Sequence, residues 1–214
     1  MQFKRDTQVY SSDGNDVGHI DRVVLNPKTK EVTHVVVRKG ILFTEDKLVP
    51  ISLIASATQN RVTLRPNAGD LNALPLYEET HYIPLDESEA NAVAYPPDMA
   101  MPLYWYAPLG GTWSGYIPQP AYRAETEQNI PDDTVAIKEG ATVFSSDDKN
   151  VGSIERVFTD SMTDRATYLV ISHGAIVKEK KSIPMSWVRA VTEDEVHLNV
   201  GASVLENLHE YQEA

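Results

Sequence analysis

The sequence predicts an all-β protein of two small antiparallel β-barrels, related by internal duplication and joined by an irregular segment rich in proline and aromatic residues. Three observations predict this fold class. The beginning of the chain recurs 134 positions later without a gap, each copy is a series of short apolar runs separated by turn residues, and the stretch between the copies differs in composition. Short strands with tight turns and little helix are typical of small barrels, whose closure removes exposed sheet edges.

The duplication is seen when residues 4–77 are laid over residues 138–211, which leaves about a third of the positions identical. The run Val17–Val23 recurs as Val151–Val157, with glycine, isoleucine and arginine in the same places. A period of 134 residues is longer than the roughly 20–50 residues of a solenoid repeat. We therefore expect a duplicated small domain, in which each copy relies on the other for a sufficient core.

The strands of each copy are predicted from β-branched runs that end at turn residues. They are Thr7–Ser11, Val17–Leu25, Val32–Lys39, Lys47–Ile51 and Arg61–Arg65 in the first copy, and Ala141–Ser145, Val151–Thr159, Thr167–Ser172, Lys181–Met185 and Glu195–Asn199 in the second. A helical turn is expected at Asp70–Leu74 and at its counterpart Val204–Leu208. Gly18 and Gly152 inside strands predict a bulge or a close approach of backbone.

The order of these features resembles the PRC-barrel domain family, named for the H subunit of the photosynthetic reaction centre and found in the RimM-type ribosome maturation factor. The segments that carry the resemblance are the turn Ser11–Asp16, Val17–Val23, Val35–Gly40, Val49–Ser52 and Leu74–Tyr77. The second copy departs from the pattern at Asp148 and His209, where the first has Gly14 and Pro75. The resemblance implies two tandem PRC-like barrels, at residues 1–77 and 134–214, and interaction rather than catalysis.

The connecting segment, residues 78–133, is unlike a flexible linker. Together with Pro75–Tyr77 it contains nine of the 13 prolines, seven of the ten tyrosines and two of the three tryptophans. Flexible linkers are polar, rich in glycine and serine and poor in aromatic residues. Tyrosine and tryptophan bury a large area at low entropic cost and dominate interaction hot spots. The predicted partner-binding residues are Tyr104, Trp105, Tyr106, Trp113 and Tyr116. An internal strap packed across the barrels is an equal alternative.

Charge is distributed unevenly along the chain, whose net charge is −12. Residues 1–74 carry ten Lys or Arg against eight Asp or Glu (+2), residues 75–133 carry one against ten (−9), and residues 134–214 carry eight against thirteen (−5). Because nucleic-acid binding needs a positive face, nucleic acid is not expected as the partner. The absence of cysteine, of a signal-peptide pattern and of a long apolar run leads us to expect a cytoplasmic protein without a membrane partner.

No catalytic or metal site is expected, and no cofactor. None of the six histidines recurs in both copies. The glycine-rich run Gly110–Gly115 is followed by prolines, so it does not fit a phosphate-binding loop that opens a helix. Serines and aspartates shared by the copies suit turns. Arg22 and Arg156 also recur, and we expect each to pair with an acid across strands.

The expected function is therefore that of a non-enzymatic scaffold or adaptor that binds a protein partner. The sequence leaves open whether the chain forms a homodimer. The alternatives are a RimM-like accessory factor in ribosome or RNA processing, which the acidic balance disfavours, and a peripheral membrane or reaction-centre-associated assembly protein, which the few basic residues disfavour.

Overall fold

The computed structural model describes residues 1–39, 45–66, 73–84, 105–106, 112–113, 122–173 and 179–212. The chain forms two compact units. The main unit combines Met1–Tyr77 with Gln128–Ala214, and the second unit is Glu78–Glu127. In the main unit, we call Met1–Tyr77 the first half and Gln128–Ala214 the second half.

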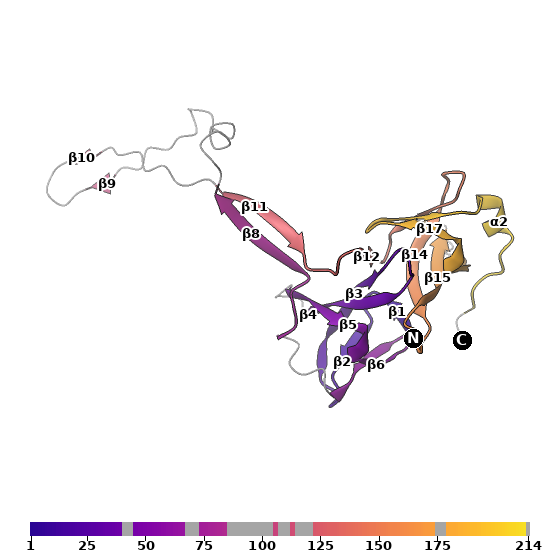
Figure 1. Cartoon of the computed structure of the whole chain (residues 1–214), viewed down its shortest axis with the longest axis horizontal. Helices are drawn as coiled ribbons and strands as arrows, with labels where there is room; N and C mark the ends of the chain where they lie inside the picture. The colour runs from indigo at the N-terminus through magenta and orange to yellow at the C-terminus, as the bar shows by residue number, and fades with distance from the viewer. Residues whose placement is uncertain are drawn as a thin grey trace. The chain divides into compact units, whose positions relative to one another are not determined.

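The first half is built on a seven-stranded sheet with the order β5-β4-β3-β2-β7-β6 (Figure 1). Its strands are β2 (Gln8–Tyr10), β3 (Asp16–Leu25), β4 (Val32–Lys39), β5 (Glu45–Pro50), β6 (Ile54–Ala57) and β7 (Arg61–Leu64). A 3-10 turn, η1 (Ile51–Leu53), joins β5 to β6. The seventh strand is β12 (Val135–Lys138), which pairs with β3 and comes from the second half.

The second half repeats this order, β16-β15-β14-β13-β18-β17. Its strands are β13 (Thr142–Phe144), β14 (Asn150–Thr159), β15 (Ala166–His173), β16 (Glu179–Pro184), β17 (Val188–Val191) and β18 (Glu195–Leu198). The turn η5 (Met185–Trp187) joins β16 to β17, and a short helix, α2 (Ala202–Glu206), follows β18. The seventh strand is β1 (Gln2–Lys4), which pairs with β14 and comes from the first half.

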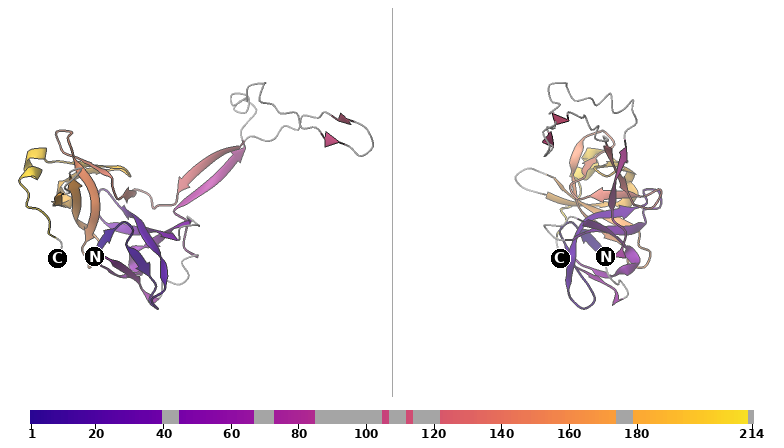
Figure 2. Two further views of the ribbon diagram at one scale, coloured as in Figure 1. Left: turned by 180° about the vertical axis from the view of Figure 1, so that it is seen from behind. Right: turned by 90° about the vertical axis from the view of Figure 1, so that its left-hand side faces the viewer.

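The two halves therefore exchange strands, and they do so in the same register. Phe3 of β1 lies opposite Val157, and Ile137 of β12 lies opposite Val23. The offset of 134 carries Phe3 onto Ile137 and Val23 onto Val157, so the two pairs are equivalent. A pseudo-two-fold axis therefore relates the halves. The strands of the two halves lie side by side in Figures 1 and 2, the first in indigo to magenta and the second in orange.

The principal core is continuous across both halves. Alternate residues of the central strands point into it, such as Val35 and Val37 of β4 and Leu169 and Ile171 of β15, and all four are almost fully buried. Alternation follows from the pleat, which sends successive side chains to opposite faces. Burial of such side chains is the main favourable term in folding.

The all-β prediction is confirmed, and most predicted strands lie within one or two residues of their observed bounds. One part of the prediction is wrong, because not every pair is antiparallel: β2 runs parallel to β7, and β13 runs parallel to β18. Strand direction depends on the path of the chain between the strands, which periodicity does not reveal. The sequence also missed the short strands β1, β6, β12 and β17. Closure of the sheets into barrels stays a prediction.

Among its described residues, the second unit contains two two-stranded sheets. Strands β8 (Glu78–Pro84) and β11 (Tyr122–Gln128) pair with each other, and their Thr80 and Thr126 hydroxyls lie 3.5 Å apart. Strands β9 (Trp105–Tyr106) and β10 (Thr112–Trp113) form the other pair. Among the residues that the structure describes, no helix has the length and apolar character needed to cross a membrane.

The close approach predicted at Gly18 and Gly152 is confirmed. Gly18 has φ +140°, and a Cβ there would lie 2.3 Å from the carbonyl oxygen of Arg38. Gly152 has φ +133°, and its Cβ would lie 2.5 Å from the carbonyl oxygen of Ser172. Each glycine lets a long central strand approach its neighbour, β4 or β15, closely.

We expect Gly18→Ala to lower the free energy of unfolding by about 1–3 kcal/mol. The substitution adds backbone strain, and the new Cβ overlaps the carbonyl oxygen of Arg38. Gly14→Ala is the matched control, since Gly14 also has a positive φ (+88°) but open space around it. Chemical denaturation of both variants measures the difference. Equal destabilisation by the two substitutions would contradict a role for the close approach.

Candidate functional site

The structure pairs two of the aromatic residues that were predicted to bind a partner. Trp105 of β9 lies directly opposite Trp113 of β10, and Tyr106 lies opposite Thr112. The backbone thus brings the two tryptophans, eight positions apart in the sequence, into one cross-strand pair. Tyr104 and Tyr116 lie outside the described residues. The aromatic site therefore stays a prediction, as does the strap alternative.

The junction between the halves, where the strands are exchanged, concentrates charged side chains. Asp21 is an unpaired bulge residue of β3, since the register with β4 passes from Ile20 directly to Arg22. Its carboxylate is almost completely buried and lies 3.3 Å from Nε of Arg5, 3.2 Å from Nε of Arg22 and 3.4 Å from Nη2 of Arg38. A buried carboxylate needs such compensation, because removal from water is costly for a charge.

Arg22 connects the halves through its side chain. Its Nη1 donates to the carboxylate of Glu193, in the turn before β18 of the second half. Its guanidinium also lies over the Tyr77 ring, 5.2 Å from the ring centroid. The predicted acidic partner of Arg22 is therefore present, but in a turn rather than on a facing strand. Its counterpart Arg156 is fully buried and donates to Oε1 of Gln2 on the exchanged strand β1, at 3.0 Å.

The equivalent carboxylate in the second half has different charged neighbours. Glu155, the counterpart of Asp21, receives Nζ of Lys180 at 2.7 Å and lies 4.0 Å from Nζ of Lys4. In the first half, the position of Lys180 is occupied by Asp46, which accepts from Nε of Arg38 at 3.2 Å. This hydrogen bond raises the pKa of the Arg38 guanidinium. The two halves thus keep the backbone and alter the charge pattern.

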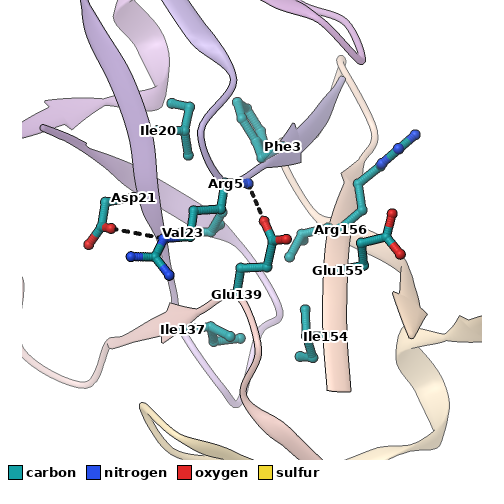
Figure 3. Close-up of a pocket in the computed structure, with 11 residues that line it drawn as sticks. Phe3, Arg5, Ile20, Asp21, Val23, Ile137, Glu139, Ile154, Glu155 and Arg156 are labelled. Atoms are coloured by element: carbon teal, nitrogen blue, oxygen red, sulfur yellow. Dashed lines mark hydrogen bonds and ion pairs between the residues drawn. The ribbon is translucent and has the colours of Figure 1, made fainter. Parts of the chain in front are cut away.

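Glu139 lies at the centre of the junction (Figure 3). Its carboxylate accepts the backbone N–H of Arg5 at 2.5 Å. Burial raises the pKa of Glu139, while that hydrogen bond and the nearby Lys4 ammonium lower it, and the nearby Glu155 and Asp6 carboxylates raise it. Sequence reasoning missed this residue. The available signal was the duplication itself, which places Glu139 over Arg5.

A cavity of about 20 Å³ lies at this junction, lined by residues from both halves. Phe3, Ile20 and Val23 line it from the first half, and Ile137 and Ile154 from the second. Such a volume suits about one water molecule and is far below that of a small-molecule site. This cavity is therefore too small to hold a small-molecule ligand.

Polar residues shared by the halves serve the turns, as predicted. Ser11 Oγ donates to the carbonyl oxygen of Asn15, and Ser145 Oγ donates to that of Lys149, both at 3.2 Å. Asp147 accepts the N–H of Ala202 at 2.9 Å at the start of α2. Hydrogen bonds from Ser145, Ala202 and Lys149 lower the pKa of Asp147.

Two of the described histidines lie in distinct surroundings. His197 stacks on Phe144 with ring centroids 5.3 Å apart, and burial lowers the pKa of His34. Within the described ranges, no group of three or more His, Cys, Asp or Glu side chains is placed to hold a metal ion.

Comparison with known protein families finds two matches, one in each half of the main unit. Residues 5–71 match the PRC-barrel domain family. Residues 137–205 match a different family, described as an uncharacterized protein conserved in bacteria (DUF2171). No curated protein matches the chain closely enough to count as a relative. Residues 5–71 are thus similar to the PRC-barrel domain, and this similarity indicates at a general level a protein-interaction or accessory role.

We expect Glu139→Gln to raise Tm at pH 7 by about 1–2 °C, because an amide oxygen still accepts the Arg5 N–H without an ionised group in a partly dry site. The folded pKa of Glu139 lies above its unfolded value of 4.5. Its ionisation therefore costs stability at neutral pH, and that cost fades as the pH falls toward the unfolded value. The difference in Tm between variant and wild type should shrink from pH 7 to pH 4.

The matched control is Glu155→Gln, which should instead lower Tm at pH 7 because Glu155 holds Lys180 at 2.7 Å. Thermal unfolding of the three proteins across the pH range measures both effects. A Glu139→Gln protein that is less stable than wild type at pH 7 would contradict the balance of burial and attraction at this site.

Proposed function

We propose that this protein is a non-enzymatic scaffold or adaptor in which a PRC-type body carries an aromatic segment that binds a protein partner. The observation that carries the proposal is the cross-strand pairing of Trp105 with Trp113 in a unit separate from the main unit. Paired strands hold their residues in fixed register, whereas a flexible linker would not. Tryptophan and tyrosine are enriched in interaction hot spots.

We also propose that the second half is a second copy of the PRC-type fold. Its support is the strand order, which repeats that of the first half, including the parallel pair and the exchanged strand. The β-bulges repeat as well, since the shift at Ile20/Arg22 corresponds to the shift at Ile154/Arg156. Bulges are specific features within a family and are seldom placed alike by chance.

The non-enzymatic part of the proposal rests on what the charged residues do. Asp21, Arg22, Glu155 and Glu139 contact other groups of the protein at the junction between the halves. The contacts of Arg22 with Glu193 and of Glu139 with the Arg5 backbone join the two halves, whereas Asp21 pairs with Arg5 and Glu155 pairs with Lys180 within one half. The PRC-barrel match indicates, at a general level, a protein-interaction or accessory role, which is consistent with a non-enzymatic scaffold.

The test is affinity capture from a bacterial lysate with the wild-type chain, with Trp105→Ser/Trp113→Ser, and with Tyr168→Ser as the control. Tyr168 is a half-exposed aromatic residue on β15, in the main unit. We expect the double variant to lose a protein partner that wild type and control retain, with at least a tenfold loss of affinity when that partner is purified. This corresponds to about 1.4 kcal/mol.

Equal capture by all three proteins would contradict the aromatic docking role. Capture of RNA with a steep dependence on salt would favour the RimM-like alternative. Flotation with lipid vesicles that depends on Trp105 and Trp113 would favour the membrane-associated alternative.

A further inference from the structure

The outer face of the first half is covered by a small apolar core of its own. This core lies on the side of the sheet away from the principal core, because alternate residues of β4 point to opposite faces: Val36 belongs to it, whereas Val35 and Val37 belong to the principal core. Ile130, which is partly buried, packs against this small core. Its buried members are Val24, Val36, Leu48, Tyr77 and Ala136.

A short segment that follows β11 brings Ile130 to this face. The backbone N–H of Asn129 donates to the carbonyl oxygen of Tyr77 at 2.9 Å, and its side-chain amide donates to that of Leu76 at 3.1 Å. Leu76 in turn forms an isolated bridge to Lys47 of β5, the last strand of the sheet on that side. The segment therefore lies beside the sheet edge, held by main-chain acceptors, with Ile130 as its apolar contact.

The equivalent face of the second half is more open. The offset of 134 carries the five buried residues onto Gln2, Phe158, Val170, Ser182 and Tyr211. Of these only Val170 is buried, and the other four are partly exposed. In the part of the chain that the structure describes, neither apolar cluster includes any of the five, and Ile130 has no counterpart in the second half.

Aromatic rings occupy this face. Phe158 lies directly opposite Tyr168 in the register of β14 and β15, so the two side chains share one side of the sheet. Tyr211 meets Phe158 edge to face, with ring centroids 6.1 Å apart, and Tyr168 is 48% exposed. The first half has Val24 and His34 where the second has Phe158 and Tyr168. We call Phe158, Tyr168 and Tyr211 the open aromatic face.

A main-chain acceptor at the edge of this face is placed as in the first half. The N–H of Tyr211 donates to a carbonyl oxygen of β16 at 2.7 Å, and the N–H of Tyr77 donates to the equivalent carbonyl oxygen of β5 at 2.7 Å. The residue before each tyrosine, Glu210 or Leu76, forms an isolated bridge to the same strand. The Tyr211 carbonyl is thus positioned like the Tyr77 carbonyl, which accepts the N–H of Asn129.

We propose that the open aromatic face is a docking site for a short apolar peptide segment of a protein partner, of the kind that residues 129–131 provide in the first half. Such a segment donates a backbone N–H to the Tyr211 carbonyl and places an isoleucine or a proline against Phe158 and Tyr168. Proline-containing segments suit aromatic surfaces, because they are extended before binding and lose little entropy. Since Ser182 stands where the first half has a leucine, the rings supply the main apolar contact.

The size of the face favours a peptide segment over a second copy of this chain. Three aromatic side chains bury at most about 450–750 Å² together, and part of this area is already covered. A stable interface between two proteins buries about 800 Å² on each partner. The face belongs to the main unit and includes neither Trp105 nor Trp113, so this site is independent of the docking role proposed for the aromatic segment.

The probe is a synthetic peptide with the sequence of residues 126–133, capped at both ends and titrated into the full chain labelled with ¹⁵N. The chain's own segment holds the equivalent site of the first half at a high effective concentration, which leaves the second half for the peptide. We expect saturable binding with a Kd on the order of 0.1–1 mM, since a short segment has few anchors. Amide resonances should shift at Phe158, Tyr168 and Tyr211 but not at Val24 and His34.

Two variants and one altered peptide test the contacts. Tyr168→Ser should weaken binding at least about fivefold, because it removes a half-exposed ring from the face. The matched control is Met162→Ser, which removes an 89% exposed apolar side chain in the turn between β14 and β15 and should bind as wild type does. A peptide with Ile130→Ser should bind the unaltered chain at least about fivefold more weakly. The amide spectrum of each variant also reports whether it is folded.

Several outcomes would overturn the proposal. The peptide could leave the spectrum unchanged, shift resonances of the first half instead, or bind equally well to Tyr168→Ser. Equal binding of the peptide with Ile130→Ser would show that no apolar side chain contacts the rings. Dimerisation that depends on concentration and is abolished by Tyr168→Ser would assign the face to a second copy of the chain instead.

Discussion

The exchange of strands between the two halves is the constraint on which the main unit depends. Each seven-stranded sheet takes one strand from the other half, β1 onto β14 and β12 onto β3. Buried backbone N–H and C=O groups must find partners, and the partners of β3 and β14 at these positions exist only across the junction. The continuous core adds to this dependence, since Phe3 and Ile137 are buried between the halves. A half of this size would otherwise expose both a sheet edge and apolar surface.

The polar chemistry of the junction is built on that exchange. The bulge in β3 places Asp21 among three arginines, and the equivalent bulge in β14 places Glu155 between two lysines. The three arginines offset the cost of burying the Asp21 carboxylate within the first half, and of these ion pairs only the one between Lys4 and Glu155 joins the two halves. The second unit is free of this constraint and carries the aromatic residues on its own strand pairs.

Prediction from the sequence succeeded where a strand is long and its side chains are alike in type. Val32–Lys39 was predicted with the bounds that the structure has, because its β-branched residues favour a pleated, buried strand. Strands of three or four residues are too short to show a period, and the sequence predicted some of them, such as β2 and β7, but missed β1, β6, β12 and β17. The partner of Arg22 could be foreseen as an acid but not as Glu193, which lies 171 positions away.

The sequence by itself determined the fold class, the duplication and the places of its glycines, because these are recorded in local patterns and in the recurrence of residues at a fixed offset. Only the tertiary structure decided the direction of the β2 and β7 pair, the exchange of β1 and β12, and the meeting of Arg5 with Glu139. The physical reason is that pairing between distant strands is selected by the burial of a shared core and the satisfaction of backbone groups, and neither leaves a mark within a short stretch of chain.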